Sequence, residues 1–214
     1  MIYLFCNKSF GPPFEEAADA YARRTGAAIT IVHARPAGPG GPFAFVRGAL
    51  DRLGRPPRLV VADVNAPEFW ERLSPGDTGV IAGFNQIFRS QAIERLDPFV
   101  NFHASLLPYY RGPAPAYWCI ANGERATGFT LHRVTANIDA GEILYQEAVP
   151  IDPVIDTLGL TRKIARLAAR MLAPWLDHVR TGSAWRAARV DAGSLYLTHA
   201  GYASFPPRQA GAGK

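Results

Sequence analysis

The N-terminal stretch of the chain places one helical segment between two apolar runs, and this order restricts the fold more than any other feature. Residues 1–6 and 27–33 are short, apolar and rich in strand-forming residues. Residues 14–25 carry helix signals, with prolines before the start, glutamates in the first turn and a glycine after the end. Such a β-α-β unit has parallel strands. The sequence therefore predicts an α/β fold.

Further elements alternate along the chain in the same way. We expect strands at residues 58–64, 77–84 and 99–103, and helices at residues 43–53, 67–73, 90–96, 114–122 and 157–181. Residues 127–134 and 141–151 also have strand character, and the gap between them is too short for a helical crossover. This pair should therefore be antiparallel and lie at an edge of the sheet.

The predicted architecture is a single Rossmann-like domain over residues 1–182. Its open, mostly parallel sheet is flanked by helices and carries the antiparallel edge pair. Residues 183–214 are rich in Gly, Ala, Pro and Arg, and we expect them to form a tail without a separate domain.

Composition and charge restrict the class of protein. The chain is 48% hydrophobic, with 23 Lys and Arg against 18 Asp and Glu, and its net charge of +5 is dispersed. That balance suits an anionic small-molecule substrate and does not indicate nucleic acid. The two cysteines provide no disulfide framework. With no signal peptide or membrane-length apolar run, we expect a cytoplasmic protein without a membrane partner. The sequence leaves a homodimer as an open alternative.

Two polar residues leave the strand at residues 99–103 together. Asn101 and His103 are two positions apart and should project from the same face of the sheet. Asp139 follows in a glycine-containing turn. We expect the Asn101 amide and a protonated His103 to stabilise an oxyanion, and Asp139 to raise the pKa of His103 and assist proton transfer. The alternatives are a structural histidine at a strand end and a carboxylate that caps its own turn.

Other chemistries have less support. The turn after the first strand, CNKSFGPP, lacks both GxGxxG and GxxxxGK[ST], so a dinucleotide or P-loop site is not indicated. The five histidines show no HExxH spacing, and we expect no metal. Ser105 follows His103 by two residues, but the surrounding residues are not GxSxG, which argues against a serine nucleophile.

The motif NFHASLLPYYRGPAP at residues 101–115, followed by Gly128, Thr130 and VTANIDAGEIL at residues 134–144, resembles the signature of the formyltransferase family that uses 10-formyltetrahydrofolate. The resemblance covers roughly residues 59–151. It implies an amine acceptor, a 10-formyltetrahydrofolate donor, and a catalytic trio made of Asn101, His103 and Asp139.

The same resemblance implies a folate cleft formed by two segments, residues 83–88 and 134–139. The expected cofactor-binding residues are Phe84, Gln86, Ile87, Phe88, Val134, Thr135, Ala136 and Ile138, although Ile87 and Phe88 also suit the core. The expected substrate-binding residues are Asn7, Lys8, Ser105, Tyr109, Tyr110 and Gly112.

Departures from the family pattern bear on the acceptor. CNKSFGPP replaces the glycine- and serine-rich phosphate loop of the glycinamide ribonucleotide enzymes, and the tail is shorter than the additional domain of the methionyl-tRNA enzymes. Aromatic residues, with Tyr117 and Trp118 among them, favour a small, sugar-linked or carrier-linked amine. The leading hypothesis is an N-formyltransferase. A hydrolase that releases formate from the same donor, a non-catalytic folate-binding domain, and a methionyl-tRNA or glycinamide ribonucleotide relative stay as alternatives.

Overall fold

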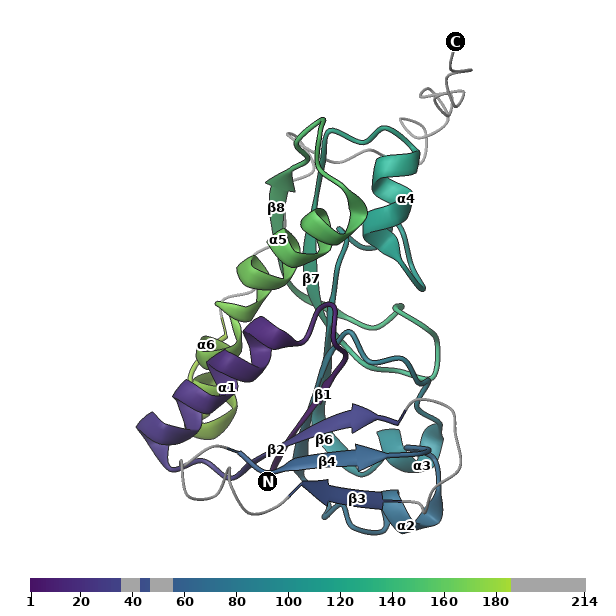
Figure 1. The fold of residues 1–214 in the computed structure, drawn as a ribbon. Coiled ribbons are helices and arrows are strands. Elements are labelled where there is room, and N and C mark those ends of the chain that lie inside the picture. Colours follow the sequence, from purple (N-terminus) through teal and green to yellow (C-terminus); the bar gives the residue numbers. More distant parts are fainter. Residues whose placement is uncertain (36–42, 47–55, 186–214) are drawn as a thin grey trace.

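The computed structural model describes residues 1–35, 43–46 and 56–185, which form one eight-stranded sheet with helices on both faces (Figure 1). The strand order is β3-β4-β2-β1-β5-β6-β7-β8. The strands are β1 Ile2–Cys6, β2 Ile29–Ala34, β3 Phe43–Val46, β4 Arg58–Val61, β5 Asp77–Ala82, β6 Leu96–His103, β7 Ala126–Arg133 and β8 Ile143–Pro150. The helices are α1 Pro12–Thr25, α2 Pro67–Trp70, α3 Ser90–Ile93, α4 Pro115–Ala121, α5 Thr157–Ala169 and α6 Leu172–Thr181.

The sheet is parallel at its centre and antiparallel at both edges. Neighbouring strands from β4 through β2, β1 and β5 to β6 are parallel. β7 is antiparallel to both β6 and β8, which confirms the predicted edge pair. β3 is antiparallel to β4 at the other edge. The prediction of an open, mostly parallel α/β sheet is confirmed.

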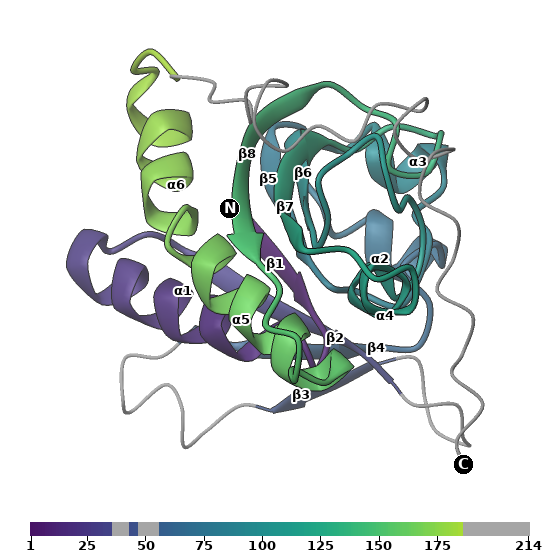
Figure 2. The ribbon, with the colours of Figure 1, turned by 90° about the horizontal axis from the view of Figure 1, so that it is seen from above.

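Two hydrophobic clusters hold the helices against the sheet. Phe14 of α1 packs against Phe102 of β6 on the face that α1, α5 and α6 cover, and these three helices lie together in Figure 2. On the other face, Phe5 lies at the centre of an aromatic cluster that includes Phe69, Phe88 and Phe99. Each fully buried aromatic or aliphatic side chain contributes roughly 1.5–3 kcal/mol, so both faces stabilise β6, which carries the site.

The helix predicted at residues 43–53 is wrong where it can be compared, because Phe43–Val46 is strand β3. The apolar positions match a helical spacing, but this short, aromatic and β-branched run pairs with the edge of β4, which supplies its backbone hydrogen bonds. Residues 47–53 lie outside the described residues.

The single helix predicted at residues 157–181 is two helices. α5 ends at Ala169 and α6 begins at Leu172. Pro174, the third residue of α6, has no N–H to donate to the carbonyl of Arg170 and its ring crowds that carbonyl, which favours an interruption of the helix just before it. The chain instead makes tighter i to i−3 bonds, from Arg170 to Leu167 and from Met171 to Ala168.

The beginning of the predicted tail packs against the domain. The Trp185 indole N–H donates to the carbonyl of Leu144 on β8 at 3.0 Å, and its ring packs against Tyr145 and Trp175. Residues 186–214 lie outside the described residues, so the domain limit at residue 182 stays a prediction. Within the described part, no helix is both long enough and apolar enough to cross a membrane.

Candidate active site

The carboxyl end of β6 and the strand beside it form the floor of the site. The antiparallel register pairs Asn101 with His132 and His103 with Thr130. Residues that lie directly opposite each other in a sheet project from the same face, so four polar side chains gather there. The period-two spacing therefore placed Asn101 and His103 on one face, as predicted, and the neighbouring strand adds two partners.

Asp139 reaches this face from the connection between β7 and β8. Its backbone is left-handed, with a φ of 48°. Gly141 allows the connection to turn back closely, because a Cβ at that position would lie 1.9 Å from the carbonyl oxygen of Arg133. Asp139 Oδ1 accepts from Asn101 Nδ2 at 3.2 Å, and Oδ2 accepts from the Gly112 N–H at 2.8 Å. One carboxylate thus joins β6 to the loop that follows it.

His103 is buried between two oxygen atoms. Its Nδ1 lies 3.4 Å from Asp139 Oδ2, its Nε2 lies 2.8 Å from the carbonyl oxygen of Tyr110, and the residue is 6% exposed. Burial lowers the pKa of His103, although Asp139 and the Tyr110 carbonyl act in the opposite direction. Asp139 thus raises this pKa, as expected, but desolvation of the ring is the larger influence and the net pKa of His103 is lowered.

Asp139 is ionised at neutral pH. Burial disfavours its charged form, but the contact with His132, the nearby His103 and the Gly112 N–H outweigh it and lower the pKa of the carboxyl group to about 2. A carboxylate held in this way can stabilise positive charge on the imidazole of His103 when that ring takes up a proton.

His132 is the residue of this group that the sequence interpretation missed. It is 2% exposed, with Nε2 3.1 Å from Asn101 Nδ2 and 3.5 Å from Asp139 Oδ1. Its Nδ1 donates to the Arg133 carbonyl at 2.8 Å. The strand-like alternation of residues 127–134 indicates that Thr130 and His132 project from the same face. The sequence does not reveal the register between β6 and β7 that places His132 beside Asn101.

A buried network holds the loop after β6 against β7 and β8. Thr130 Oγ1 donates to the carbonyl of Ser105 at 2.7 Å and accepts from the N–H of Leu107 at 3.0 Å. Gln146 Nε2 donates to Thr130 Oγ1 at 3.0 Å and to the carbonyl of Leu107 at 2.7 Å. Gln146 was also not identified from the sequence. These bonds fix the backbone that turns towards His103.

The loop after β1 holds two of the predicted substrate-binding residues. Asn7 Oδ1 accepts from the backbone N–H groups of Ser9 and Phe10, and Asn7 Nδ2 donates to Asn85 Oδ1 at 3.1 Å. Asn7 therefore ties the loop after β1 to the loop after β5. Lys8 is exposed beside it.

The predicted substrate-binding residues of the loop after β6 mostly support the loop itself. Ser105 is fully buried, and its hydroxyl donates to the carbonyl of Tyr109 at 2.7 Å, so the structure does not place it at a surface that a substrate can reach. The Tyr110 hydroxyl donates to Glu124, and Gly112 uses its N–H to bind Asp139. Tyr109 is half-buried.

Comparison with known proteins agrees with this arrangement of strands and loops. Residues 67–175, just over half of the chain, match the formyl transferase family. The chain belongs to the formyl transferase family. Formyltransferases of this family use 10-formyltetrahydrofolate as the formyl donor.

Curated relatives in the formyl transferase family are methionyl-tRNA formyltransferases. The protein from Roseiflexus castenholzii is 41% identical over 155 residues, covering 70% of this chain and 49% of the relative. The protein from Koribacter versatilis is 33% identical over 191 residues, covering 85% of this chain and 60% of the relative. The chain thus spans about half the length of the curated relatives it matches.

Solved formyltransferase structures share the fold. Glycinamide ribonucleotide transformylase 1 from Symbiobacterium toebii superposes with a TM-score of 0.65 and 21% identity, covering 89% of this chain and 93% of that one. A sugar N-formyltransferase from a Shewanella species gives a TM-score of 0.64 and 20% identity, covering 89% and 73%.

The residues expected at the formyl donor divide into two groups. Gln86 has a structural role, because its side chain hydrogen-bonds to the backbone on both sides of residue 63. It accepts from the Val64 N–H at 2.9 Å and donates to the Ala62 carbonyl at 2.8 Å. Phe88 is buried in the aromatic cluster and Phe84 packs beside it, so the structure gives Gln86 and Phe88 supporting positions.

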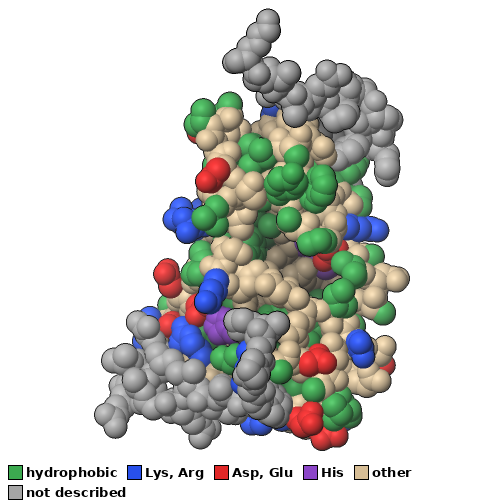
Figure 3. All heavy atoms as spheres, turned by 45° about the vertical axis from the view of Figure 1, so that its right-hand side comes forward, with side chains coloured by type: hydrophobic (Ala, Val, Ile, Leu, Met, Phe, Trp, Pro, Cys, Tyr) green, Lys and Arg blue, Asp and Glu red, His purple; other side chains and the backbone are tan. Residues whose placement is uncertain are grey.

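Exposed apolar residues border the same edge of the sheet. Ile87 is 66% and Ile138 53% exposed, and Thr135 and Ala136 are exposed as well. The N–H of Val134 donates to the carbonyl of Phe99, which brings the second segment against β6. Figure 3 shows a recess on this side of the molecule, where an acidic side chain and a histidine lie together among hydrophobic side chains. Exposed isoleucines beside polar strand ends suit a flat heterocycle such as the folate pterin.

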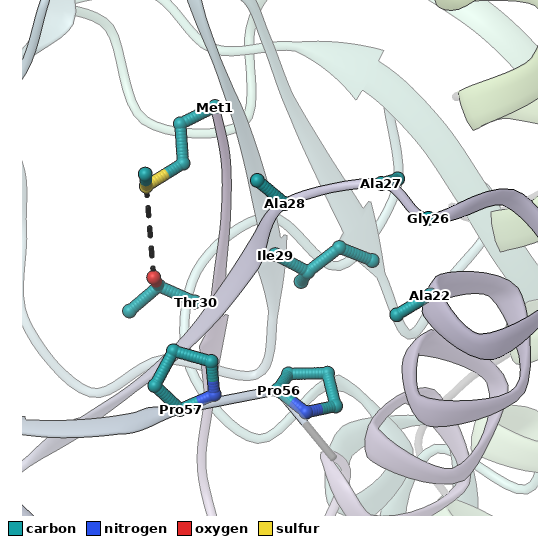
Figure 4. Close-up of a pocket in the computed structure, with 9 residues that line it drawn as sticks. All are labelled: Met1, Ala22, Gly26, Ala27, Ala28, Ile29, Thr30, Pro56 and Pro57. Carbon is teal, nitrogen blue, oxygen red and sulfur yellow. Dashed lines mark hydrogen bonds between the residues drawn. The ribbon is translucent and has the colours of Figure 1, made fainter. Parts of the chain in front are cut away.

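A separate cavity of about 270 Å³ lies at the amino ends of the central strands (Figure 4). Its lining comes from the amino ends of β1 and β2, the end of α1 and the prolines before β4, with Thr30 donating to the sulfur of Met1 at 3.7 Å. Ligands of open parallel sheets bind outside the carboxyl ends of the strands, and no titratable side chain lines this cavity among the described residues. We therefore place the candidate site at Asp139 and not at this cavity.

Proposed function

We propose that this protein transfers a formyl group from 10-formyltetrahydrofolate to a primary amine of a small, sugar-linked or carrier-linked acceptor. The observation that carries the proposal is the position of Asp139, whose carboxylate contacts the Asn101 amide and lies 3.4 Å from His103 Nδ1. An amide donor, an imidazole and an ionised carboxylate then converge at the carboxyl end of β6, within a chain of the formyl transferase family.

The donor supplies a formyl carbon that an amine can attack. Transfer forms a bond between the amine nitrogen and that carbon and breaks the bond from the carbon to the folate nitrogen. Negative charge develops on the formyl oxygen, and we assign its stabilisation to the Asn101 amide, because the Nε2–H of His103 is already bound by the Tyr110 carbonyl. The amine must lose a proton, and the folate nitrogen must gain one. We assign this proton transfer to His103 Nδ1, with Asp139 stabilising the charged ring.

The choice of acceptor rests on the loops around this trio. The loop after β1 is shaped by Asn7 and lacks the series of glycines that would expose backbone N–H groups to a phosphate. Tyr117 and Trp118 on α4 are half-exposed and pack edge to face, which offers an aromatic surface beside the loop after β6. These features favour a small or carrier-linked amine whose recognition does not depend on a phosphate loop.

The decisive experiment supplies 10-formyltetrahydrofolate with a panel of amines, namely methionyl-tRNA, glycinamide ribonucleotide and a dTDP-linked amino sugar. We expect a formylated product from at least one amine, detected by mass spectrometry, and loss of that product in Asp139→Asn. Rapid release of formate in the absence of any amine would overturn the transferase proposal in favour of a hydrolase. If methionyl-tRNA were the only amine that gave a product, the proposed class of acceptor would be wrong, whereas the proposed formyl transfer to an amine would stand.

A further inference from the structure

His132 has ring nitrogens with two different and well-defined partners. Nδ1 lies 2.8 Å from the carbonyl oxygen of Arg133, and a carbonyl oxygen can only accept a hydrogen bond, so Nδ1 carries a hydrogen. Nε2 lies 3.1 Å from Asn101 Nδ2, an amide nitrogen that can only donate. Nε2 therefore carries a lone pair. In the neutral ring these two contacts define the Nδ1–H tautomer of His132, and the same Nε2 also lies 3.5 Å from Asp139 Oδ1.

This tautomer determines where the Asn101 amide nitrogen points. The amide has two N–H groups, and both have acceptors, because one faces His132 Nε2 at 3.1 Å and the other faces Asp139 Oδ1 at 3.2 Å. A flipped amide would place its oxygen against a carboxylate oxygen and a nitrogen lone pair, which is unfavourable at both positions. The amide nitrogen is therefore fixed at the side of the site where Asp139 lies.

The two bonds differ in strength. The bond to Asp139 is charge-assisted, and such bonds are roughly twice as strong as those between neutral groups. The bond to His132 joins neutral partners. When a formyl oxygen develops negative charge beside Asn101, one N–H of the amide must turn towards it. The N–H that faces His132 can do so at a lower energetic cost than the N–H that faces Asp139.

We infer that His132 is a positioning residue for the transfer reaction, which holds the Asn101 amide nitrogen in place and yields one of its N–H groups to the formyl oxygen. The inference rests on the proposed function, since it acts through Asn101. It adds to the trio a fourth side chain that touches no substrate.

A buried histidine with only a packing role predicts different behaviour. Its loss would lower stability without a specific effect on turnover, and that effect would add to the effect of an Asn101 variant. A positioning role predicts that His132 matters only while Asn101 is present. A double-mutant cycle separates these two roles.

The test measures kcat and KM with 10-formyltetrahydrofolate and the amine identified in the panel, for His132→Leu, Asn101→Ala and the double variant. We expect His132→Leu to lower kcat about 10–100-fold, less than the ~10²–10³ typical of losing an oxyanion donor. The folate KM should stay close to that of the parent protein. The double variant should be no slower than Asn101→Ala. Additive losses in kcat, or an unchanged kcat in His132→Leu, would overturn the inference.

A second pair of variants keeps the test decisive if His132→Leu does not fold. Glutamine extends as far as Nε2 and can still accept from Asn101, whereas asparagine extends only as far as Nδ1. We expect His132→Gln to retain most of kcat and His132→Asn to lose it, and equal kcat values in these two variants would contradict the inference.

Two controls complete the experiment. His178→Gln on α6, where the ring packs between Trp175 and Trp185, is the matched histidine control and should leave kcat unchanged. If Asn101→Ala itself retains the parent kcat, the proposed function fails. If Asn101→Ala is impaired and His132→Leu is not, only the role of His132 fails.

Discussion

The carbonyl oxygen of Tyr110 lies 2.8 Å from His103 Nε2, so one backbone oxygen determines which ring nitrogen carries the hydrogen in the neutral form. Because Nε2–H donates to this oxygen, Nδ1 is the position that can take up a proton, and it faces Asp139. Tyr110 adopts a left-handed backbone with a φ of 57°. The conformation of one loop residue thus sets the chemistry available to the histidine.

The hydroxyl of Tyr110 secures that conformation, and Tyr110→Phe should weaken it. The hydroxyl donates to Glu124 Oε1 at 2.6 Å and accepts from Asn122 Nδ2 at 3.2 Å. We expect a loss of about 1 kcal/mol in the free energy of unfolding, because the bonds are only partly buried. The kcat should also fall while the folate KM changes little. Denaturant unfolding and steady-state kinetics measure both effects, and a parent-like kcat would show that the carbonyl does not need this support.

Substitution of Gly141 should displace Asp139. A Cβ there would lie 1.9 Å from the Arg133 carbonyl oxygen, so Gly141→Ala must move the β7–β8 connection. We expect about 1–3 kcal/mol of destabilisation together with a large loss of turnover. Gly182→Ala is the matched control, since Gly182 has a positive φ but a Cβ at that position would meet no atom within 4 Å. Gly182→Ala should lose stability through strain and keep its kcat.

Removal of the Thr130 hydroxyl should loosen the loop that follows His103. Thr130→Val leaves the Leu107 N–H and the Ser105 carbonyl without the partner that Thr130 provides. Each unsatisfied buried group costs about 1–3 kcal/mol, so we expect a clear drop in melting temperature. Thr127→Val on the same strand is the control, because its hydroxyl accepts from the Cys119 thiol, a weak donor. Equal destabilisation by the two variants would contradict a special role for the Thr130 network.

Acid should weaken the fold through the two titrating members of the trio. The folded-state pKa of Asp139 is about 2, below the ordinary aspartate value of 3.8, so its contribution is present above pH 4 and is lost as the pH falls towards 2. That contribution is roughly 2 kcal/mol. The lowered pKa of His103 acts in the same direction, since the unfolded chain binds a proton first as the pH falls below about 6.5.

Unfolding titrations at a series of pH values test this dependence. The parent protein should lose stability as the pH falls below about 6.5, where His103 contributes, and again between pH 4 and 2, where Asp139 contributes. Asp139→Asn should be less stable at neutral pH and should have a shallower dependence between pH 4 and 2, where the lowered pKa of Asp177 still contributes. A parent-like slope in this variant between pH 4 and 2 would assign the acid sensitivity to other carboxylates.

The prediction of the fold succeeded where local signals agree with the tertiary structure. The prolines and the glycine around α1 mark its ends, and the apolar runs on either side form β1 and β2. The prediction failed where contacts with the rest of the protein, or a single proline, determine the conformation of a segment. The segment Phe43–Val46 is too short to determine its own conformation and pairs with β4, and the interruption between α5 and α6 depends on Pro174, which the apolar periodicity of this stretch conceals.

The candidate site was predictable in part for similar reasons. The spacing of Asn101 and His103 places them on one face of any strand, whereas bringing Asp139 to that face requires the conformation of the β7–β8 connection. His132 and Gln146 depend on strand register, which no local pattern reveals.

The strand order gives the position of the trio a further consequence. Asn101 and His103 lie on the last parallel strand, and Asp139 follows the first antiparallel one, so the site spans the boundary between two parts of the sheet. Proteins open locally in cooperative units, and an edge pair is a natural unit of this kind. A brief separation of β7 and β8 from the parallel core would remove Asp139 while the core stays folded. Amide hydrogen exchange along β7 would then report on the active population more directly than global unfolding does.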